Sequence, residues 1–182
     1  HGVKLLSMGL LINESDPVAV RGPLATRYVQ QFLRNVAWGD VDFLILDLPP
    51  GTGDIQLTIV QTAELDGVVV VTTPQEVALI DARKAIGLFE RVETPILGII
   101  ENMSYFQCPS DGKIYHIFGE GGGEREAAKL GVPLLGKIPL DISTRSGGDE
   151  GRPVALEDPG QNPVSAAFRQ VAEQCARVVL DR

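Results

Sequence analysis

Asp47 follows an apolar run and precedes two prolines and a glycine in Phe43–Asp54, FLILDLPPGTGD. A carboxylate at the end of a strand is well placed to hold hydrated Mg²⁺ through its water shell, because this hard cation keeps its waters. Gly51 can bring its backbone N–H close to an anionic ligand, since no side chain stands in the way. These residues suit a γ-phosphate sensor. From spacing alone, a strand end followed by an ordinary turn, with Asp54 as N-cap, is an equal alternative.

The elements that must position Asp47 alternate between strand and helix. In the expected strands the apolar residues are contiguous, as in parallel strands covered on both faces. This pattern predicts an α/β fold with a doubly wound, mostly parallel sheet, whose strand C-termini gather on one ligand-binding edge. The expected strands span residues 3–11, 43–48, 67–73, 96–101 and 134–139, and the expected helices span 24–38, 54–64, 76–92, 124–131 and 162–180. We expect one domain over residues 1–182, an irregular insertion at 105–123 and a polar loop at 143–163.

Composition narrows the classes of function. The chain has 182 residues, of which 44% are hydrophobic, so it can bury a core. Its net charge of −8 repels phosphate backbones, so we do not expect nucleic acid as a partner. No apolar stretch approaches the length of a membrane span, so we expect no membrane partner. Two cysteines are too few for a disulfide framework, which fits a reducing, cytoplasmic compartment.

Longer motifs resemble one family over nearly the whole chain. VDFLILDLPPGTGD is similar to the Walker B and switch II segment of MinD-like ATPases. RGPLATRYVQQFL, VVVTTPQEVALIDARKAI, PILGIIENMSYFQCP and HIFGEGGGEREAAKLGVPLLGKIPLD resemble the Mrp (ApbC/Nbp-like) family, ATPases that carry iron–sulfur clusters. The resemblance implies a MinD-like P-loop NTPase fold, ATP and Mg²⁺ as ligands, a homodimer, and transfer of a [4Fe–4S] cluster to apo iron–sulfur proteins or assembly factors.

The resemblance also implies roles for individual residues. Asp47 would act on Mg²⁺ through water, and Gly51 would donate its backbone N–H toward the γ-phosphate. Asn102 would bind the adenine edge, because a side-chain amide both donates and accepts hydrogen bonds. Without the resemblance, a turn residue or helix cap is the simpler interpretation of Asn102. Pro139 and Asp141 match the segment that packs on the adenine ring.

Two arginines are weaker candidates for phosphate binding, since guanidinium groups match phosphate oxygens. Arg21 lies in a loop at the expected ligand edge, where it could instead contact a partner or a second subunit. Arg83 lies within an expected helix, and we expect it to pair with Asp81 or Glu76.

The phosphate loop of this family, G-K-G-G-V-G-K-[ST], has no counterpart in the sequence. The segment FGEGGGERE at 118–126 is glycine-rich, but its glutamates would repel phosphate. The family places the loop upstream of the segment with which this chain starts. We therefore expect that His1 is not the natural start, that the sheet is incomplete at its N-terminus, and that this chain alone binds ATP poorly without hydrolysing it. Whether the chain itself is an enzyme stays open.

The cluster motif also departs from the family pattern C-P-x-C, in which two subunits supply the four thiolates of one [4Fe–4S] cluster. Here the segment reads Cys108-Pro-Ser-Asp111, and a carboxylate is a poor ligand for sulfide-rich iron. A bound cluster should therefore be weak or labile. His116 is near enough to substitute as a ligand, although a lone histidine is more often structural. We expect Cys175 to lie in the core.

Two functions stay open on these residues. One is an ATP-dependent iron–sulfur cluster carrier or scaffold, which Cys108 favours. The alternative is a MinD-like nucleotide switch that binds a protein partner through residues 105–123 without a cluster, which Asp111 favours. A sheet domain without any ligand is a third interpretation. A dehydrogenase-like Rossmann fold is excluded, because no G-x-G-x-x-G follows an early strand.

Overall fold

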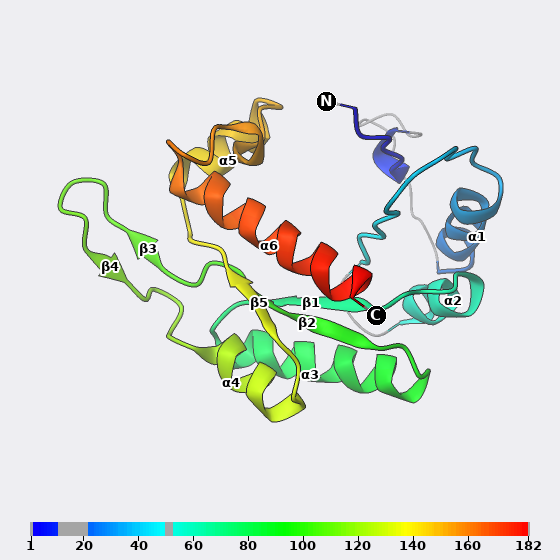
Figure 1. The fold of residues 1–182 in the computed structure, drawn as a ribbon. Helices are drawn as coiled ribbons and strands as arrows, with labels where there is room; N and C mark the ends of the chain where they lie inside the picture. Colours follow the sequence, from blue (N-terminus) through cyan, green and yellow to red (C-terminus); the bar gives the residue numbers. More distant parts are fainter. Residues whose placement is uncertain (1, 11–21, 50–52, 182) are drawn as a thin grey trace. The chain divides into compact units, whose positions relative to one another are not determined.

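A computed structural model describes residues 2–10, 22–49 and 53–181, which fall into two compact units divided between Leu65 and Asp66 (Figure 1). The helices are η1 (Met8–Leu10), α1 (Gly22–Arg34), α2 (Asp54–Thr62), α3 (Glu76–Arg91), α4 (Gly122–Leu130), α5 (Ile142–Asp149), η2 (Val154–Leu156) and α6 (Pro163–Leu180), where η marks a 3₁₀ helix. The strands are β1 (Val68–Thr72), β2 (Ile96–Glu101), β3 (Phe106–Gln107), β4 (Ile114–Tyr115) and β5 (Leu134–Lys137). None of the helices described is long and apolar enough to cross a membrane.

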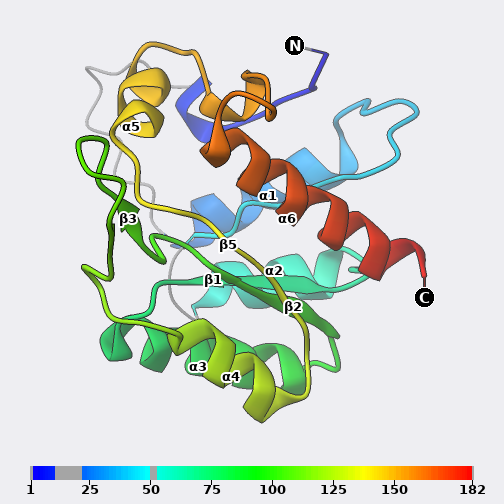
Figure 2. The ribbon, with the colours of Figure 1, turned by 60° about the vertical axis from the view of Figure 1, so that its left-hand side comes forward.

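The second unit is built on a parallel sheet with the strand order β1-β2-β5. Val70 of β1 lies beside Ile99 of β2, and Ile100 lies beside Gly136 of β5. Helices α3 and α4 cover one face of this sheet and α6 covers the other (Figures 1 and 2). The three strands that the sequence predicts after residue 65 are therefore confirmed, and so is the doubly wound α/β class of this unit.

The contiguous apolar runs supply the core of the second unit. Val70 and Ile99 of the sheet are buried against Ile86 of α3 and Ala127 of α4. On the other face, α6 approaches β5 so closely that a Cβ at position 136 would lie 2.5 Å from Val171 Cγ2. Glycine fits there because a side chain at position 136 would have to displace the side chain of Val171.

The first unit departs from the sequence prediction. The strand expected at 43–48 is irregular chain, and of the strand expected at 3–11 the described residues form coil followed by η1. Most of their apolar side chains are exposed, with Leu5 at 75% and Ile45 at 86%, and the others are half-buried. A strand is stabilised by the hydrogen-bond ladder to a neighbour, and no described strand pairs with either segment. The helices expected near 24–38 and 54–64 are present as α1 and α2.

Two further segments, which we expected to be irregular, contain helices or strands. Residues 143–163, which we expected to be a loop, contain most of α5 and all of η2. Gly147 lies in α5, where a Cβ would be 2.4 Å from the carbonyl oxygen of Arg152. The insertion at 105–123 contains the short antiparallel hairpin β3–β4, with Phe106 opposite Tyr115.

Candidate functional site

The loops that follow β2 and β5 lie side by side at the carboxyl edge of the sheet in the second unit. The N–H of Asn102 donates to the carbonyl of Thr72 at the end of β1 (2.7 Å). The N–H of Ser104 donates to Ile138 O (2.9 Å), and the N–H of Leu140 donates to Tyr105 O (2.7 Å). The structure therefore brings the loop of Asn102 against the segment that contains Pro139, on the edge where ligands bind in such sheets.

Asn102 is half-buried, and its side chain helps to shape the loop. Its Oδ1 accepts a hydrogen bond from the N–H of Met103 at 3.0 Å. Met103 has a φ of +52°, a left-handed conformation that is uncommon for a bulky residue and concentrates at functional sites. Among the hydrogen bonds of the described residues, none uses the Asn102 amide nitrogen, which could therefore donate to a ligand.

Asp141 is the N-cap of α5. Its Oδ2 accepts from the N–H of Thr144 at 2.8 Å and also from the hydroxyl of Ser143. Burial raises the pKa of Asp141, but the hydrogen bonds from Ser143 and Thr144 outweigh it and hold that pKa below its ordinary value. The carboxylate is thus committed to the helix start, while the half-buried Pro139 beside it is free of such a role.

The β3–β4 hairpin carries Cys108 at the start of its connecting turn. The N–H of Cys108 donates to Lys113 O and the N–H of Gly112 donates to Cys108 O, both at 2.8 Å. The Cys108 Sγ lies 3.1 Å from the hydroxyl oxygen of Ser110. Hydrogen bonds from Ser110, through its hydroxyl and its N–H, and from the N–H of Asp111 lower the pKa of the Cys108 thiol. The turn therefore stabilises a thiolate, the form that binds metal.

Asp111 lies in the same turn, and a hydrogen bond from the Cys108 thiol to its carboxyl group raises the pKa of that thiol, although less than Ser110 and the backbone lower it. Its Oδ1 accepts from the N–H of Lys113 at 3.0 Å, the main cause of the lowered pKa of Asp111. His116 lies instead 3.6 Å from a carboxylate oxygen of Glu120. No group of three or more histidine, cysteine, aspartate or glutamate side chains among the described residues could hold a metal ion. A single copy of the hairpin offers only Cys108 and Asp111.

The remaining candidates lie in the first unit or outside the described residues. Asp47 is exposed and lies on irregular chain, so the predicted strand that would hold it is not formed. Gly51 and Arg21 fall outside the described residues. Cys175, expected in the core, is half-buried in α6, and burial raises the pKa of its thiol.

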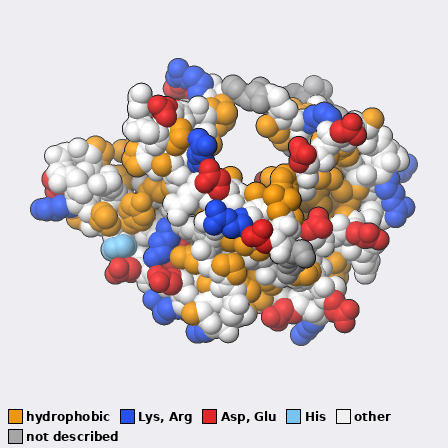
Figure 3. Space-filling model, in the orientation of Figure 1, with side chains coloured by type: hydrophobic (Ala, Val, Ile, Leu, Met, Phe, Trp, Pro, Cys, Tyr) orange, Lys and Arg blue, Asp and Glu red, His pale blue; other side chains and the backbone are white. Residues whose placement is uncertain are grey.

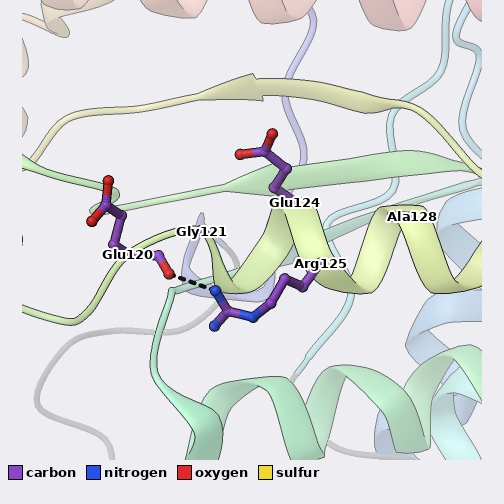
Figure 4. Close-up of a pocket in the computed structure, with 5 residues that line it drawn as sticks. All are labelled: Glu120, Gly121, Glu124, Arg125 and Ala128. Carbon is purple, nitrogen blue, oxygen red and sulfur yellow. Dashed lines mark hydrogen bonds between the residues drawn. The ribbon is translucent and has the colours of Figure 1, made fainter.

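The glycine-rich segment before α4 forms a shallow depression of about 450 Å³ (Figure 4). Figure 4 shows the carboxylates of Glu120 and Glu124 pointing to one side of the chain and Arg125 to the other. The Arg125 Nη1 donates back to the carbonyl of Glu120 at 2.8 Å. The N–H of Gly123 is already bound by a carboxyl oxygen of Glu101. The Gly123 N–H is therefore engaged within the chain, and two carboxylates line the depression.

Sequence reasoning missed two buried carboxyl groups, Glu101 and Glu126. Glu126 of α4 binds Arg83 of α3 through both carboxyl oxygens, at 2.9 and 2.6 Å. Arg83 also pairs with Glu76, as expected, whereas Asp81 pairs with Lys84. Acidic and basic side chains are interspersed over α3 and α4 (Figure 3). The sequence gives no signal for Arg83–Glu126, because the two residues are far apart in the chain and meet only when the helices pack.

A family model described as ParA, NUBPL iron-transfer P-loop NTPase, matches residues 1–176. The chain belongs to this family. Its relatives include the iron-sulfur cluster carrier protein of Pyrococcus furiosus, 48% identical over 94% of this chain and 58% of its own length. The carrier protein of Synechocystis is 47% identical over 97% of this chain and 50% of that protein. The chain thus spans about half the length of these curated relatives, 58% and 50%.

Solved structures confirm the fold. A nucleotide-binding protein from Archaeoglobus fulgidus, determined in complex with ADP, is similar with a TM-score of 0.64 and 43% identity, over 71% of this chain and 53% of that one. The cell division ATPase MinD of Pyrococcus furiosus is similar with a TM-score of 0.62 and 24% identity, over 84% of this chain and 59% of that one. At this identity, the similarity supports the fold only. The chain therefore has the MinD-like α/β fold that its motifs predict.

Proposed function

We propose that this member of the family binds an iron–sulfur cluster as cargo and delivers it to apo iron–sulfur proteins or assembly factors, with ATP binding and hydrolysis controlling delivery. The observation that carries the proposal is the turn at Cys108, whose backbone and hydroxyl groups stabilise a thiolate. A thiolate-stabilising turn has a direct use in a chain of an iron-transfer family. The names of its relatives support the choice of cargo.

The ligand set follows from what one hairpin can offer. Cys108 and Asp111 converge in one turn, so two copies of the chain would supply two thiolates and two carboxylates to a shared [4Fe–4S] cluster. The function therefore requires a homodimer. Carboxylates bind sulfide-rich iron less tightly than thiolates do, so the cluster should leave more readily than from four cysteines. Such lability suits a carrier, and the two free cysteines suit the reducing cytoplasm.

The nucleotide would bind at the carboxyl edge of the sheet. The Asn102 amide nitrogen is available for the edge of adenine, and Pro139 lies on the neighbouring loop, where it can pack against the ring. Asp141 would contribute mainly by fixing that loop through its cap on α5. Asp47 would act on Mg²⁺ through water, and Gly51 would donate to the γ-phosphate.

Anaerobic reconstitution with iron and sulfide tests the proposal. We expect a broad absorption near about 400 nm from the bound cluster, lost in Cys108→Ala and kept in the matched control Cys175→Ala. Asp111→Cys raises the number of thiolates in a pair of copies from two to four, so its cluster should survive a chelator several-fold longer than that of the wild type. Absorption that is equal in wild type and Cys108→Ala would refute the cargo site.

A partner-binding nucleotide switch without a cluster is the alternative function. Two observations favour it: the carboxylate of Asp111 stands where a thiolate is wanted, and Ile114 and Ile117 are each 56% exposed on the hairpin segment. Under this alternative, wild type gives no absorption after reconstitution, whereas Asp111→Cys does. A wild-type cluster that depends on Cys108 rules the alternative out.

A further inference from the structure

Glu101 is the last residue of β2, and its side chain is completely buried (0% exposed). Each of its two carboxyl oxygens accepts a hydrogen bond, and the two donors come from different segments of the chain. The hydroxyl of Ser104 donates to Oε1 at 2.5 Å, and the N–H of Gly123 donates to Oε2 at 2.7 Å. One carboxyl group thus joins the loop after β2 to the first turn of α4.

The start of α4 is shaped to fit this carboxyl group. A Cβ on Gly123 would lie 3.1 Å from Glu101 Cβ and 3.2 Å from Oε2. A Cβ on Gly122 would lie 2.5 Å from the carbonyl oxygen of Pro74. Glycines at both positions let the helix begin directly against the end of the sheet. The glycine-rich segment therefore accommodates an internal carboxyl group instead of a phosphate.

The Ser104 side of the contact leads to the proposed cargo site. Ser104 is 3% exposed, and its N–H binds Ile138 O. The next residue, Tyr105, accepts from Leu140 N–H, and Phe106 forms a bridge with Leu140 before the chain enters the Cys108 turn. Asn102 precedes Ser104 in the same loop, and the hairpin follows it. Glu101 thus holds the one segment that contains both the proposed base contact and the base of the hairpin.

We propose that Glu101 is a positioning residue, whose carboxyl group fixes the loop after β2 so that Asn102 and the Cys108 hairpin keep a set orientation. The inference rests on the proposed cargo site at Cys108. A core filler is a poor explanation of Glu101, because burying a carboxyl group costs free energy that an apolar side chain of similar size would not. Its two donors lie on the two segments that it links: Ser104 is in the loop after β2, and Gly123 is in the first turn of α4.

Three variants separate the links that Glu101 makes. Ser104→Ala cuts the link to the loop but keeps the contact with Gly123. Glu101→Gln keeps the shape, since its Oε1 can accept from Gly123 and its amide can donate to the Ser104 hydroxyl. Glu101→Ala removes both links. Glu120→Gln is the matched control, because it removes a carboxylate near the start of α4 that is exposed.

The first measurement is hydrogen–deuterium exchange in the apo chain. For Ser104→Ala we expect exchange over residues 102–107 to be about fivefold faster, from the loss of about 1 kcal/mol of hydrogen bonding. Residues 122–130 should change little in that variant. Glu101→Ala should accelerate both segments, and Glu101→Gln and Glu120→Gln should stay near wild type. Unchanged exchange at 102–107 in Ser104→Ala would overturn the inference.

The second measurement is release of the reconstituted cluster to a chelator, which a purely structural role would leave unchanged. We expect about fivefold faster release from Ser104→Ala, on the same free-energy scale, with rescue in Glu101→Gln. Equal release from wild type and Ser104→Ala, with a cluster present in both, overturns the inference and leaves the proposed function standing. If the wild type forms no Cys108-dependent cluster, the proposed function fails, and the role of Glu101 toward the cargo fails with it.

Discussion

Replacing Glu126 by glutamine should weaken the packing of α4 on α3. The Glu126 side chain is 6% exposed and accepts from Arg83 Nε at 2.9 Å and Nη2 at 2.6 Å. Lys129 Nζ also donates to it, at 2.7 Å. A glutamine has the same size but no charge, and its NH₂ group would face one of these cations. The variant therefore tests the charge of Glu126 with little change of volume.

The magnitude follows from the pKa of Glu126. Hydrogen bonds from Arg83, and then from Lys129, lower this pKa from 4.5 to about 2. The full shift corresponds to about 3 kcal/mol of stability at neutral pH. Because the Arg83 side chain is 37% exposed, solvent screens part of this interaction, and we expect Glu126→Gln to lower the free energy of unfolding by about 1–2 kcal/mol.

Urea denaturation followed by far-ultraviolet circular dichroism measures this difference, and a pH series gives its sign. A lowered folded-state pKa stabilises the protein above the unfolded value of 4.5, and the contribution is lost as the pH falls from there toward 2. The stability gap between wild type and Glu126→Gln should therefore be full at pH 7 and close in acid. The exposed Arg169–Glu173 pair, at 3.0 Å, provides the control, since Glu173→Gln should cost less than about 0.5 kcal/mol.

Two results would refute this reasoning. One is a loss at neutral pH no larger for Glu126→Gln than for Glu173→Gln, because the buried position would then add nothing. The other is a gap for Glu126→Gln that persists unchanged toward pH 2, because a charge effect must vanish once the wild-type carboxylate is protonated.

Three further outcomes are expected from unfolding measurements. Gly136→Ala should cost about 1–3 kcal/mol, because its Cβ would lie 2.5 Å from Val171 Cγ2; a loss that Val171→Ala does not reduce in the double variant would contradict this. Asn162→Ala should cost about 1 kcal/mol by removing the cap of α6, whereas Asn162→Asp should keep most of it. Asp141→Ala should cost about 1 kcal/mol at neutral pH through the lost bond to Thr144, and a cost that does not shrink in acid would exclude the cap as its cause.

Sequence patterns correctly predicted the helices α1 to α4 and α6, which are stabilised by local hydrogen bonds, and the strands that pack in the apolar core of the second unit. The apolar residues of β1 and β2 are contiguous in the sequence. This pattern predicts strands that are covered on both faces, and α3 and α6 do cover the two faces of the sheet. The same pattern failed at 43–48, because a parallel strand also needs a hydrogen-bonded neighbour, and no described strand supplies one. An apolar run indicates that a segment should be buried, but it does not identify the neighbouring strand with which the segment would pair.

The candidate site was only partly predictable for a similar reason. The Asn102 and Pro139 loops could be placed at one edge from topology alone, and the structure brings them together. Glu101 was not predicted, because the sequence does not distinguish a carboxyl group that turns into the interior from one that is exposed at a strand end. Its donor Gly123 lies in a segment remote in sequence, and no periodicity reports such a contact.

The hydrogen bonds at the base of the hairpin restrict how a cargo could be passed on. Ser104 and Tyr105 are stitched to the strand-like segment after β5 on the way to the Cys108 turn. Pivoting there would break those bonds, so they oppose a swinging motion of the tip. Under the proposed function, a recipient would then have to dock against the hairpin itself, and the surface shape of the recipient would decide which proteins receive the cluster.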